Sequence, residues 1–300
     1  MWLLLFILLA TIILYRCYRQ RQILENLTDK YVLITGCDSG FGNLAARQLD
    51  KRGLKVLATC LTKKGAEDLK RETSSRLQTV ILDVTDSQSV CSTAEWVGRI
   101  VGNKGLWGLV NNAGFGHCLA PNEWQRKEDF SKARIKAHGR IVNVSSALGR
   151  LSSVGGGYCI SKFGVEAFSD SLRRELRFFG IKISIIEPGC FATAMSVTEL
   201  HKKNLKYLWD NLPMEVKEIY GEPYYQKYVQ CLSGLTGSAS ENLNKVTDCM
   251  EHALTAIHPW TRYSPGLDSK LYYIPLSYFP TVIADFLLCR SEWKPVPRAG

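Results

Sequence analysis

The sequence lacks the signatures of several common protein classes. Its ten cysteines form no CxxC pair and no zinc-finger spacing. Several of them, such as Cys159 and Cys190, lie in segments that we expect to be buried, which favours small core residues over a disulfide framework. We therefore predict no metal site. Internal repeats and low-complexity tracts are also absent. The composition, 46% hydrophobic and 22% charged, is that of a globular protein rather than a disordered one.

Acidic residues are in the minority, because 38 Lys and Arg residues face 28 Asp and Glu residues and leave a net charge of +10. Such an excess can indicate an acidic partner, such as nucleic acid or anionic lipid. The basic residues are scattered, however, and no zinc-finger, helix-turn-helix or RNA-binding signature accompanies them. We therefore predict no nucleic-acid partner.

Charge is missing altogether from residues 2–15, WLLLFILLATIILY, and a basic stretch starts directly afterwards at Arg16. As a helix, this run would rise about 21 Å, which is less than the roughly 30 Å hydrocarbon core of a bilayer. No small-residue cleavage site follows it, so we predict a retained membrane anchor over 1–22 rather than a cleaved signal. The basic flank favours a cytosolic position for the rest of the chain, but so short a segment leaves the sidedness open.

From residue 29 onwards, apolar β-branched runs alternate with stretches of helical composition. This alternation predicts an α/β fold, with a Rossmann-like, doubly wound parallel sheet covered on both faces, in a single domain over 29–300. A strand, a glycine turn and a helix are expected within 29–53, further strands within 54–61, 77–85, 106–114, 139–149 and 181–189, and further helices within 63–74, 89–102 and 158–180.

The C-terminal third has a different character. Residues 194–262 are helical in composition and rich in Trp and Tyr, which fits either helices that cover a substrate or ordinary helix packing. The last apolar segment, 271–289, contains Pro275 and Pro280. Because proline interrupts a helix, we predict contact with a membrane surface rather than a second span.

Three glycines, Gly36, Gly40 and Gly42, lie between the first expected strand and its helix. The pyrophosphate of a dinucleotide needs a tight turn, close backbone approach and the positive end of a helix. Glycines at a strand-to-helix junction supply all three. The alternative is a plain turn, but the alternating strands and helices around it favour a cofactor loop.

Two further candidates come directly after or at the ends of expected strands. Asn111 begins the run Asn-Asn-Ala-Gly at the end of the fourth strand, and Asp83 ends the third. Ligands of open α/β sheets bind at the carboxyl ends of the strands, so both residues are candidates for cofactor contact. Asp83 could contact adenine, or it could be a turn or helix-capping residue, and the sequence does not choose.

The most specific pattern is Ser146 at the end of the fifth strand, followed by Tyr158 and Lys162 on a helix. A spacing of four places Tyr and Lys on one helical face. A phenol with a pKa of about 10 is a poor base at neutral pH, but a neighbouring ammonium favours the phenolate and lowers that pKa. Tyr158 could then take an alcohol proton while Ser146 holds the alcohol oxygen.

Together these motifs resemble the short-chain dehydrogenase/reductase family. The strings ITGCDSGFGN, LWGLVNNAG, GGGYCISKFGVEAFSDSLRRE and VTDCMEHAL are similar to its microsomal branch of retinol and 3α-hydroxysteroid (17β-hydroxysteroid type 6) dehydrogenases. The resemblance implies an enzyme of the endoplasmic reticulum membrane that oxidises a retinoid or a steroid with NAD. It also implies catalytic roles for Ser146, Tyr158 and Lys162, and cofactor contacts for Gly36, Ser39, Gly40, Phe41, Gly42, Asp83, Asn111, Pro188, Gly189 and Thr193.

The choice between NAD and NADP stays open on the residues themselves. An NAD enzyme often ends its second strand with a carboxylate for the ribose hydroxyls. Here that position reads Thr-Cys-Leu-Thr over 59–62 and then Lys63 and Lys64. The two lysines could meet a 2′-phosphate, or they could be solvated residues at the start of a helix. We keep NAD as the expectation and NADP as the alternative.

One departure from the family concerns the segment between Gly114 and Gly139. It holds only 24 residues, and we estimate that about 18 are missing, although a parallel crossover needs only about a dozen. Eight of the 24 are charged, and the large apolar residues do not recur at helical spacing. The resemblance implies a helix there that covers one face of the sheet and packs in the dimer interface. Without it we expect apolar sheet surface to be uncovered, and a homodimer is in doubt here.

Two functional hypotheses follow from these patterns. The first is an oxidoreductase that moves a hydride between the alcohol carbon of a lipophilic substrate, a retinoid or a hydroxysteroid, and a nicotinamide cofactor. The second is a splice-like variant of the same fold with low stability and little or no activity, which would act as a binding protein if at all. The intact serine, tyrosine and lysine favour the first, and the short segment favours the second.

Overall fold

The computed structural model describes residues 2–113, 135–153, 157–193, 198–237 and 239–289. Its centre is one parallel sheet of seven strands in the order β3-β2-β1-β4-β5-β6-β7. Six strands confirm the sequence prediction: β1 (Tyr31–Ile34), β2 (Lys55–Cys60), β3 (Gln78–Ile81), β4 (Leu106–Asn111), β5 (Ile135–Val144) and β6 (Lys182–Ile186). The seventh, β7 (Arg262–Tyr263), was not predicted, because two residues are too few to form a pattern.

The helices include the four that the sequence predicted within 29–53, 63–74, 89–102 and 158–180. They are α1 (Trp2–Arg21), α2 (Gly40–Lys51), α3 (Lys63–Arg71), α4 (Ser87–Val101), α6 (Gly157–Glu175), α7 (Thr198–Asp210), α8 (Met214–Tyr220), α9 (Glu222–Gly237), α10 (Asn244–Thr255), α11 (Ile274–Leu276) and α12 (Thr281–Cys289). Local chemistry sets their ends. Asp86 accepts hydrogen bonds from the backbone N–H groups of Gln88 and Ser89 and so caps α4.

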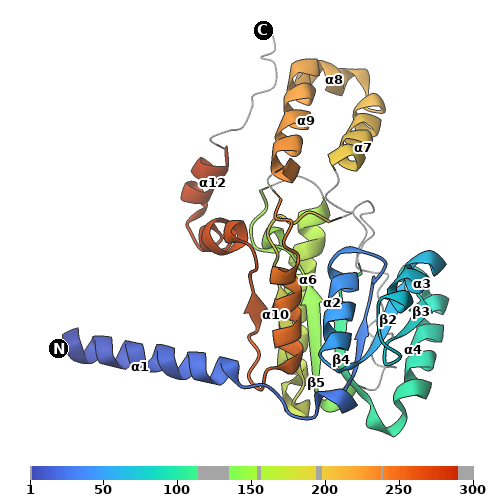
Figure 1. Cartoon of the computed structure of the whole chain (residues 1–300). Helices are drawn as coiled ribbons and strands as arrows, with labels where there is room; N and C mark the ends of the chain where they lie inside the picture. Colours follow the sequence, from blue (N-terminus) through green and yellow to red (C-terminus); the bar gives the residue numbers. More distant parts are fainter. Residues whose placement is uncertain (1, 114–134, 154–156, 194–197, 238, 290–300) are drawn as a thin grey trace.

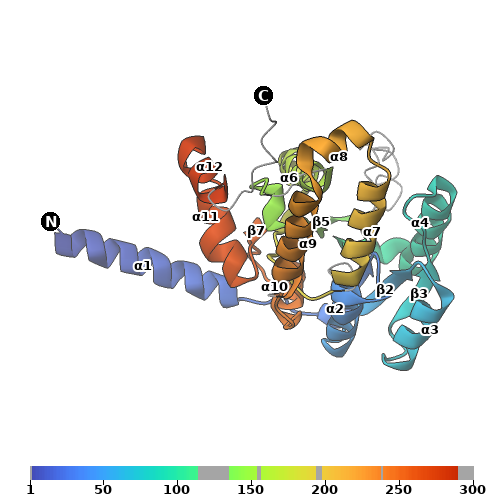
Figure 2. The same cartoon turned by 90° about the horizontal axis from the view of Figure 1, so that it is seen from above.

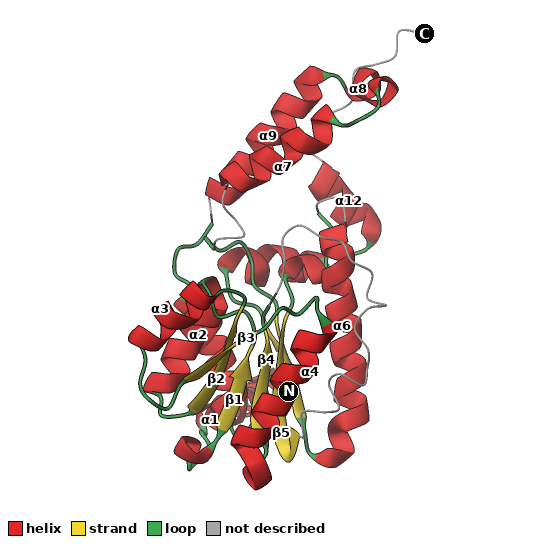
Figure 3. Ribbon diagram, turned by 90° about the vertical axis from the view of Figure 1, so that its right-hand side faces the viewer, coloured by secondary structure: helices red, strands yellow, loops and turns green. Residues whose placement is uncertain are grey.

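The two faces of the sheet are covered unequally (Figure 3). On one face, α2, α3 and α10 pack on the strands around a core of 22 buried residues, whose centre includes Ile34, Met250 and Leu254. On the other face, the described core that α4 makes with the sheet has six buried residues, among them Leu33 and Leu109. The predicted parallel sheet with helices on both faces is therefore confirmed, but most of the described apolar burial is on one side.

The short crossover has a smaller effect on the sheet than the sequence suggested. We expected apolar sheet surface to be uncovered, yet Leu33, Leu109 and Ile141, which occupy neighbouring register positions, are 7%, 6% and 4% exposed. The first two lie against α4, in one core cluster with its residue Val97. Exposed apolar side chains instead lie on α6, where Ile160 is 72% exposed. The segment 115–138, for which we predicted a poor helix, lies outside the described residues up to position 134.

The N-terminal segment forms the helix expected there, and Figures 1 and 2 show α1 projecting away from the sheet and its covering helices. Its large apolar side chains, such as Phe6 and Leu14, are exposed. Across the described ranges, none of the helices combines the length and the apolar character needed to cross a bilayer. At the other end of the chain, Pro280 precedes α12, in agreement with the predicted interruption.

The region predicted to be helical and aromatic forms α7, α8, α9 and α10. The first three lie together beyond the end of the sheet at which α2 and α6 begin (Figure 1). Trp209 of α7 stacks on Tyr225 of α9, with ring centroids 4.9 Å apart, so part of the aromatic content serves packing between these helices.

The core around α10 generates a stability prediction. Leu254 is fully buried, and a Cβ built on Gly108 of β4 would lie 2.7 Å from its Cδ2 atom. Leu254→Ala should lower the free energy of unfolding by about 2–5 kcal/mol, because the cavity cannot collapse against the rigid sheet. Leu208→Ala in α7 is the control, since Leu208 is 61% exposed. Urea unfolding in mild detergent measures both, and equal values for the two variants would contradict the proposed core.

Candidate active site

The carboxyl ends of β1 and β4 are joined by a polar side chain. Thr35 follows β1, and its Oγ1 accepts hydrogen bonds from the backbone N–H groups of Asn112 (3.0 Å) and Ala113 (2.9 Å). In return, Asn112 Nδ2 donates to the carbonyls of Thr35 (2.9 Å) and Gly36 (3.1 Å). The two motifs that the sequence singled out separately, after the first and the fourth strand, therefore form one connected structure.

Backbone crowding explains the glycines of the first loop. Gly36 has a φ of 71°, and a Cβ there would lie 2.9 Å from Ala113 Cα. Gly40 also has a positive φ, 62°. A Cβ on Gly42 would lie 2.2 Å from the Gly36 carbonyl oxygen, so no side chain can stand between the loop and α2.

The N-terminus of α2 fits a phosphate group. Ser39 is its N-cap residue but makes no side-chain capping hydrogen bond, so the first N–H groups of this 12-residue helix are not taken by that side chain. Helix N-terminal N–H groups favour anions. The glycine loop and the helix start together have the shape and polarity that a dinucleotide pyrophosphate requires.

Two more predicted cofactor residues lie beside this loop. Thr193 is 3.8 Å from the position that a Cβ on Gly40 would occupy. The ring of Phe41 meets Phe191 edge-on, with centroids 5.8 Å apart. The segment after β6 is thereby brought next to the start of α2, although about 150 residues separate the two in sequence.

The predicted catalytic residues come together after the carboxyl end of β5 and in the first turns of α6. Ser146 is 8% exposed, and its hydroxyl group lies close enough to the Tyr158 phenol to lower the pKa of that phenol. Lys162 lies one turn further along α6, with its Nζ 5.6 Å from the centre of the Tyr158 ring, and donates to the Val144 carbonyl at 3.2 Å. Asn111 and Asn143 continue the polar row, with Nδ2 of the first 2.8 Å from Oδ1 of the second.

The electrostatics of this group differ from the sequence expectation. Burial lowers the pKa of Lys162 to about 8, against an opposing influence of Glu166. Burial raises the pKa of the Tyr158 phenol, and the Ser146 hydroxyl group offsets part of that rise. We had expected the ammonium to lower the phenol pKa. In the protein alone desolvation is the larger effect, and the Nζ is held by a carbonyl instead of the phenol oxygen.

The loop of Pro188 and Gly189 is held from the far end of the chain. Asp268 accepts a hydrogen bond from the Cys190 N–H at 2.6 Å, and a Cβ on Gly189 would lie 2.1 Å from its Oδ1. The Pro188 carbonyl accepts from the Ala147 N–H at 2.9 Å, which ties this loop to Ser146. Sequence reasoning missed Asp268, because a lone acid 79 residues away carries no local signal.

Sequence reasoning also missed Asp38, which lies in the glycine loop after β1 and contacts the backbone that follows β2. Its carboxylate accepts hydrogen bonds from the backbone N–H groups of Leu61 (2.7 Å) and Thr62 (2.9 Å). The acid that we looked for after the second strand is therefore supplied by the glycine loop. Lys63 and Lys64 are exposed at the start of α3, which agrees with either alternative that we left open for them.

Asp83 takes part in a turn. Its Oδ1 accepts hydrogen bonds from the backbone N–H and the hydroxyl group of Thr85, at 2.9 and 2.6 Å, and these bonds lower its pKa. The structure thus shows the turn that we considered as one alternative, while its contact with adenine stays a prediction.

Comparisons with known proteins agree with these features. A family model described as short chain dehydrogenase matches residues 30–135 and 130–204. Retinol dehydrogenase 7 of Rattus norvegicus is 53% identical to this chain, in an alignment that covers 98% of this chain and 99% of the rat protein. 17-beta-hydroxysteroid dehydrogenase type 6 of Bos taurus is 51% identical with the same coverage. A solved short chain dehydrogenase from Burkholderia cenocepacia in complex with NADP has a TM-score of 0.58 at 19% identity, over 82% of this chain and 100% of its own.

The alignments also bear on the short crossover. The comparison with the rat protein spans 313 positions but includes 98% of these 300 residues, about 294. About 19 aligned positions therefore have no residue in this chain. The two segments matched by the family model meet between residues 130 and 135, within the stretch in which the sequence indicated a loss of about 18 residues.

The crowding at Gly42 yields a binding prediction. Gly42→Ala should weaken NADH binding at least about 10-fold, because its Cβ would collide with the Gly36 carbonyl and push the loop out of shape. Gly98→Ala is a matched control, since a Cβ at Gly98 in α4 has nothing within 4 Å. Titration of NADH fluorescence measures the dissociation constants. Unchanged affinity in the Gly42 variant would mean that the loop does not hold the cofactor.

Proposed function

This chain belongs to the short-chain dehydrogenase family, and we propose that it moves a hydride between the alcohol carbon of a lipophilic substrate and a nicotinamide cofactor. The gathering of Ser146, Tyr158 and Lys162 carries the proposal, with Ser146 close to the phenol and the Lys162 Nζ 5.6 Å from the centre of its ring. A polar group is needed at three points of such a reaction: to hold the alcohol oxygen, to exchange its proton, and to keep the proton acceptor charged. These three side chains supply one each.

The role of each residue follows from its place. Ser146, buried and fixed at the end of β5, would hold the substrate oxygen. Tyr158 would take the alcohol proton, and the charged Lys162 would favour the phenolate. The cofactor, when bound, accepts or donates the hydride. The glycine loop and the start of α2 would hold its pyrophosphate, and Pro188, Gly189 and Thr193 would lie beside its nicotinamide end.

The substrate class rests on the curated relatives, which are named for retinol and for a 17-beta-hydroxysteroid. We propose a retinoid or a steroid alcohol, reached from the membrane of the endoplasmic reticulum. Exposed apolar side chains at both ends of the chain support a membrane contact, for example Phe6 on α1 and Val282 and Phe286 on α12.

NAD is the cofactor that we propose, with NADP as the alternative. The Asp38 carboxylate lies against the backbone that follows β2, which is where an adenosine ribose is held in this fold. A carboxylate there accepts hydrogen bonds from ribose hydroxyls and repels a 2′-phosphate.

A second candidate function is a protein of the same fold with little or no catalytic activity. The gap of about 19 aligned positions favours it, because the sequence indicates a loss of similar size in the crossover that would cover one face of the sheet. Such a protein would still bind a nicotinamide nucleotide through its glycine loop.

The direct test is cofactor reduction by membranes that contain this chain, with all-trans-retinol or androstanediol and NAD or NADP. Tyr158→Phe should lower the rate by about 10²–10⁴-fold, because the proton acceptor is lost. NADH binding should be retained. Tyr31→Phe is the control, since Tyr31 begins β1 and so lies at the end of the strands opposite to the candidate site. NADH binding without any turnover by the parent chain would favour the second candidate.

The cofactor preference can be tested at Asp38. The parent chain should use NAD at least about 10-fold better than NADP in kcat/KM, and Asp38→Asn should bring that ratio closer to one by removing the repulsive charge. Asp68→Asn, on α3, is the matched control. Steady-state rates with each cofactor give both ratios. A preference for NADP in the parent chain would point to Lys63 and Lys64 instead.

A further inference from the structure

An acidic side chain that the proposed steps do not use lies one turn beyond Lys162. Tyr158, Lys162 and Glu166 follow one another at intervals of four on α6, so they occupy neighbouring positions on one face of the helix. Glu166 is only 6% exposed. A carboxylate so deeply buried is costly unless other charges compensate for it, so its surroundings need an explanation.

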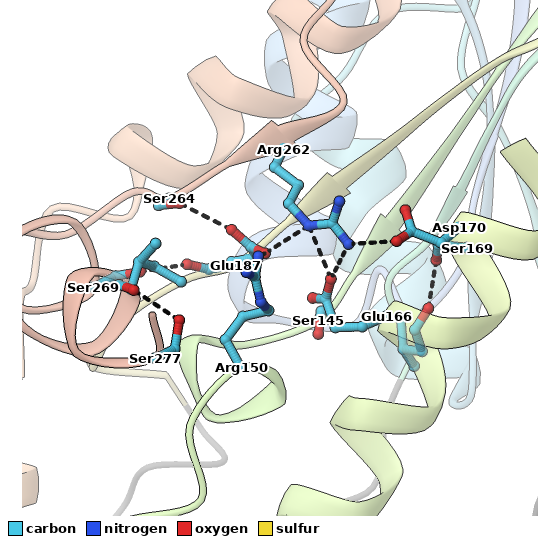
Figure 4. Close-up of polar contacts among 12 residues, drawn as sticks. Ser145, Arg150, Glu166, Ser169, Asp170, Glu187, Arg262, Ser264, Ser269 and Ser277 are labelled. Carbon is cyan, nitrogen blue, oxygen red and sulfur yellow. Dashed lines mark hydrogen bonds and ion pairs between the residues drawn. The ribbon is translucent and has the colours of Figure 1, made fainter. Parts of the chain in front are cut away.

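Arg262 of β7 binds this carboxylate from one side. Its Nε and Nη2 lie 3.3 and 3.0 Å from Glu166 Oε2 (Figure 4). The same guanidinium also reaches Glu187 Oε1 at 3.1 Å and Asp170 Oδ2 at 3.1 Å. Arg150 adds a second bond to Glu187 Oε1, also at 3.1 Å. Glu166 is therefore fixed by a network that joins α6, the end of β6, and β7.

The other carboxylate oxygen of Glu166 has no donor. Its Oε1 is buried and makes no hydrogen bond in the structure. Ser145 lies close enough to lower the pKa of Glu166, but its hydroxyl group donates to the Lys162 carbonyl at 3.3 Å. The network thus binds one oxygen of the carboxylate and leaves the second without a hydrogen-bond partner, one turn from the lysine.

We infer that Glu166 is a positioning residue, whose buried carboxylate keeps the Lys162 ammonium charged beside Tyr158. Arg262 holds this carboxylate on its far side and so fixes its position. A lysine and a glutamate at this spacing on a helix have Cβ atoms about 5–6 Å apart, which is within the range of a direct electrostatic effect.

The charges around the pair support this assignment. Burial lowers the pKa of Lys162 to about 8, and Glu166 is the one charged group that raises it. Burial and the neighbouring Glu187 raise the pKa of Glu166 above its ordinary value, and Ser145 and Arg262 offset part of that rise. Of the other groups, Asp170 and Arg150 act on the network rather than on the lysine. Without Glu166, the pKa of Lys162 would fall further below its ordinary value.

The role of Lys162 rests on the proposed function, so the first test does not require catalysis. Lys162 is half-buried, and a small reagent such as acetic anhydride modifies only its neutral amine. Modification of Lys162 is followed by mass spectrometry between about pH 6 and 10, the range around its ordinary and shifted pKa values. The midpoint of the parent profile should lie near pH 8.

Glu166→Gln keeps the shape of the side chain and removes its charge. Its labelling midpoint should fall by about one pH unit or more, because an opposite charge at this distance favours the ammonium by that amount. Glu166→Asp keeps the charge but draws it back, so its midpoint should lie in between, and it serves as the second variant if Glu166→Gln does not fold. Asp170→Asn is the control within the same network and should leave the midpoint unchanged.

The inference is overturned if the Lys162 midpoint is the same in the parent and in both Glu166 variants. That result is independent of turnover, so it is distinct from failure of the proposed function, which would appear as no cofactor reduction by the parent chain. With an active parent, Glu166→Gln should also shift the acid limb of kcat to higher pH while KM changes little. A purely structural role would lower kcat by the same factor at every pH.

Discussion

The parallel alignment of the strands is the constraint on which the whole site depends. Because every strand of the described sheet points the same way, the ends of β1, β4, β5 and β6 meet at one edge. Thr35 accepts from the backbone that follows β4, Asn111 donates to Asn143, and the Pro188 carbonyl accepts from Ala147. These side-to-side bonds turn four separate loops into one continuous surface, against which a cofactor and an alcohol could be held.

The two layers of helices contribute differently to that surface. The layer of α2, α3 and α10 contains most of the described core and fixes the glycine loop. The opposite layer carries Tyr158 and Lys162 on α6 and has the smaller described core. In the proposed function, nucleotide binding would therefore depend mainly on the well-packed side, and proton transfer on the side with the smaller described core. This separation explains how the fold can keep a binding loop even if catalysis is impaired.

α6 combines three tasks along one face. Tyr158 at its start would meet the substrate, Lys162 supplies the charge, and Glu166 and Asp170 connect the helix to Arg262 and through it to Glu187. The apolar side chains of Ile160 and Phe163 on the same helix are exposed. Ionic bonds in the interior cost desolvation energy and seldom stabilise a fold by themselves. Here these bonds fix the position of the Glu166 carboxylate relative to Lys162.

The sequence by itself determined the strand order along the chain, the glycine loop and the spacing of Tyr158 and Lys162, because each depends on neighbours within a few residues. Only the tertiary structure decided three contacts. Asp38 accepts a hydrogen bond from the backbone that follows β2, Asp268 accepts one from the loop after Pro188, and Arg262 forms an ion pair with Glu166. Each of these contacts joins residues at least 23 positions apart, and a lone charged residue in sequence looks the same whether it is solvated or buried. Folding brings such residues together, and burial then makes their charges strong enough to matter.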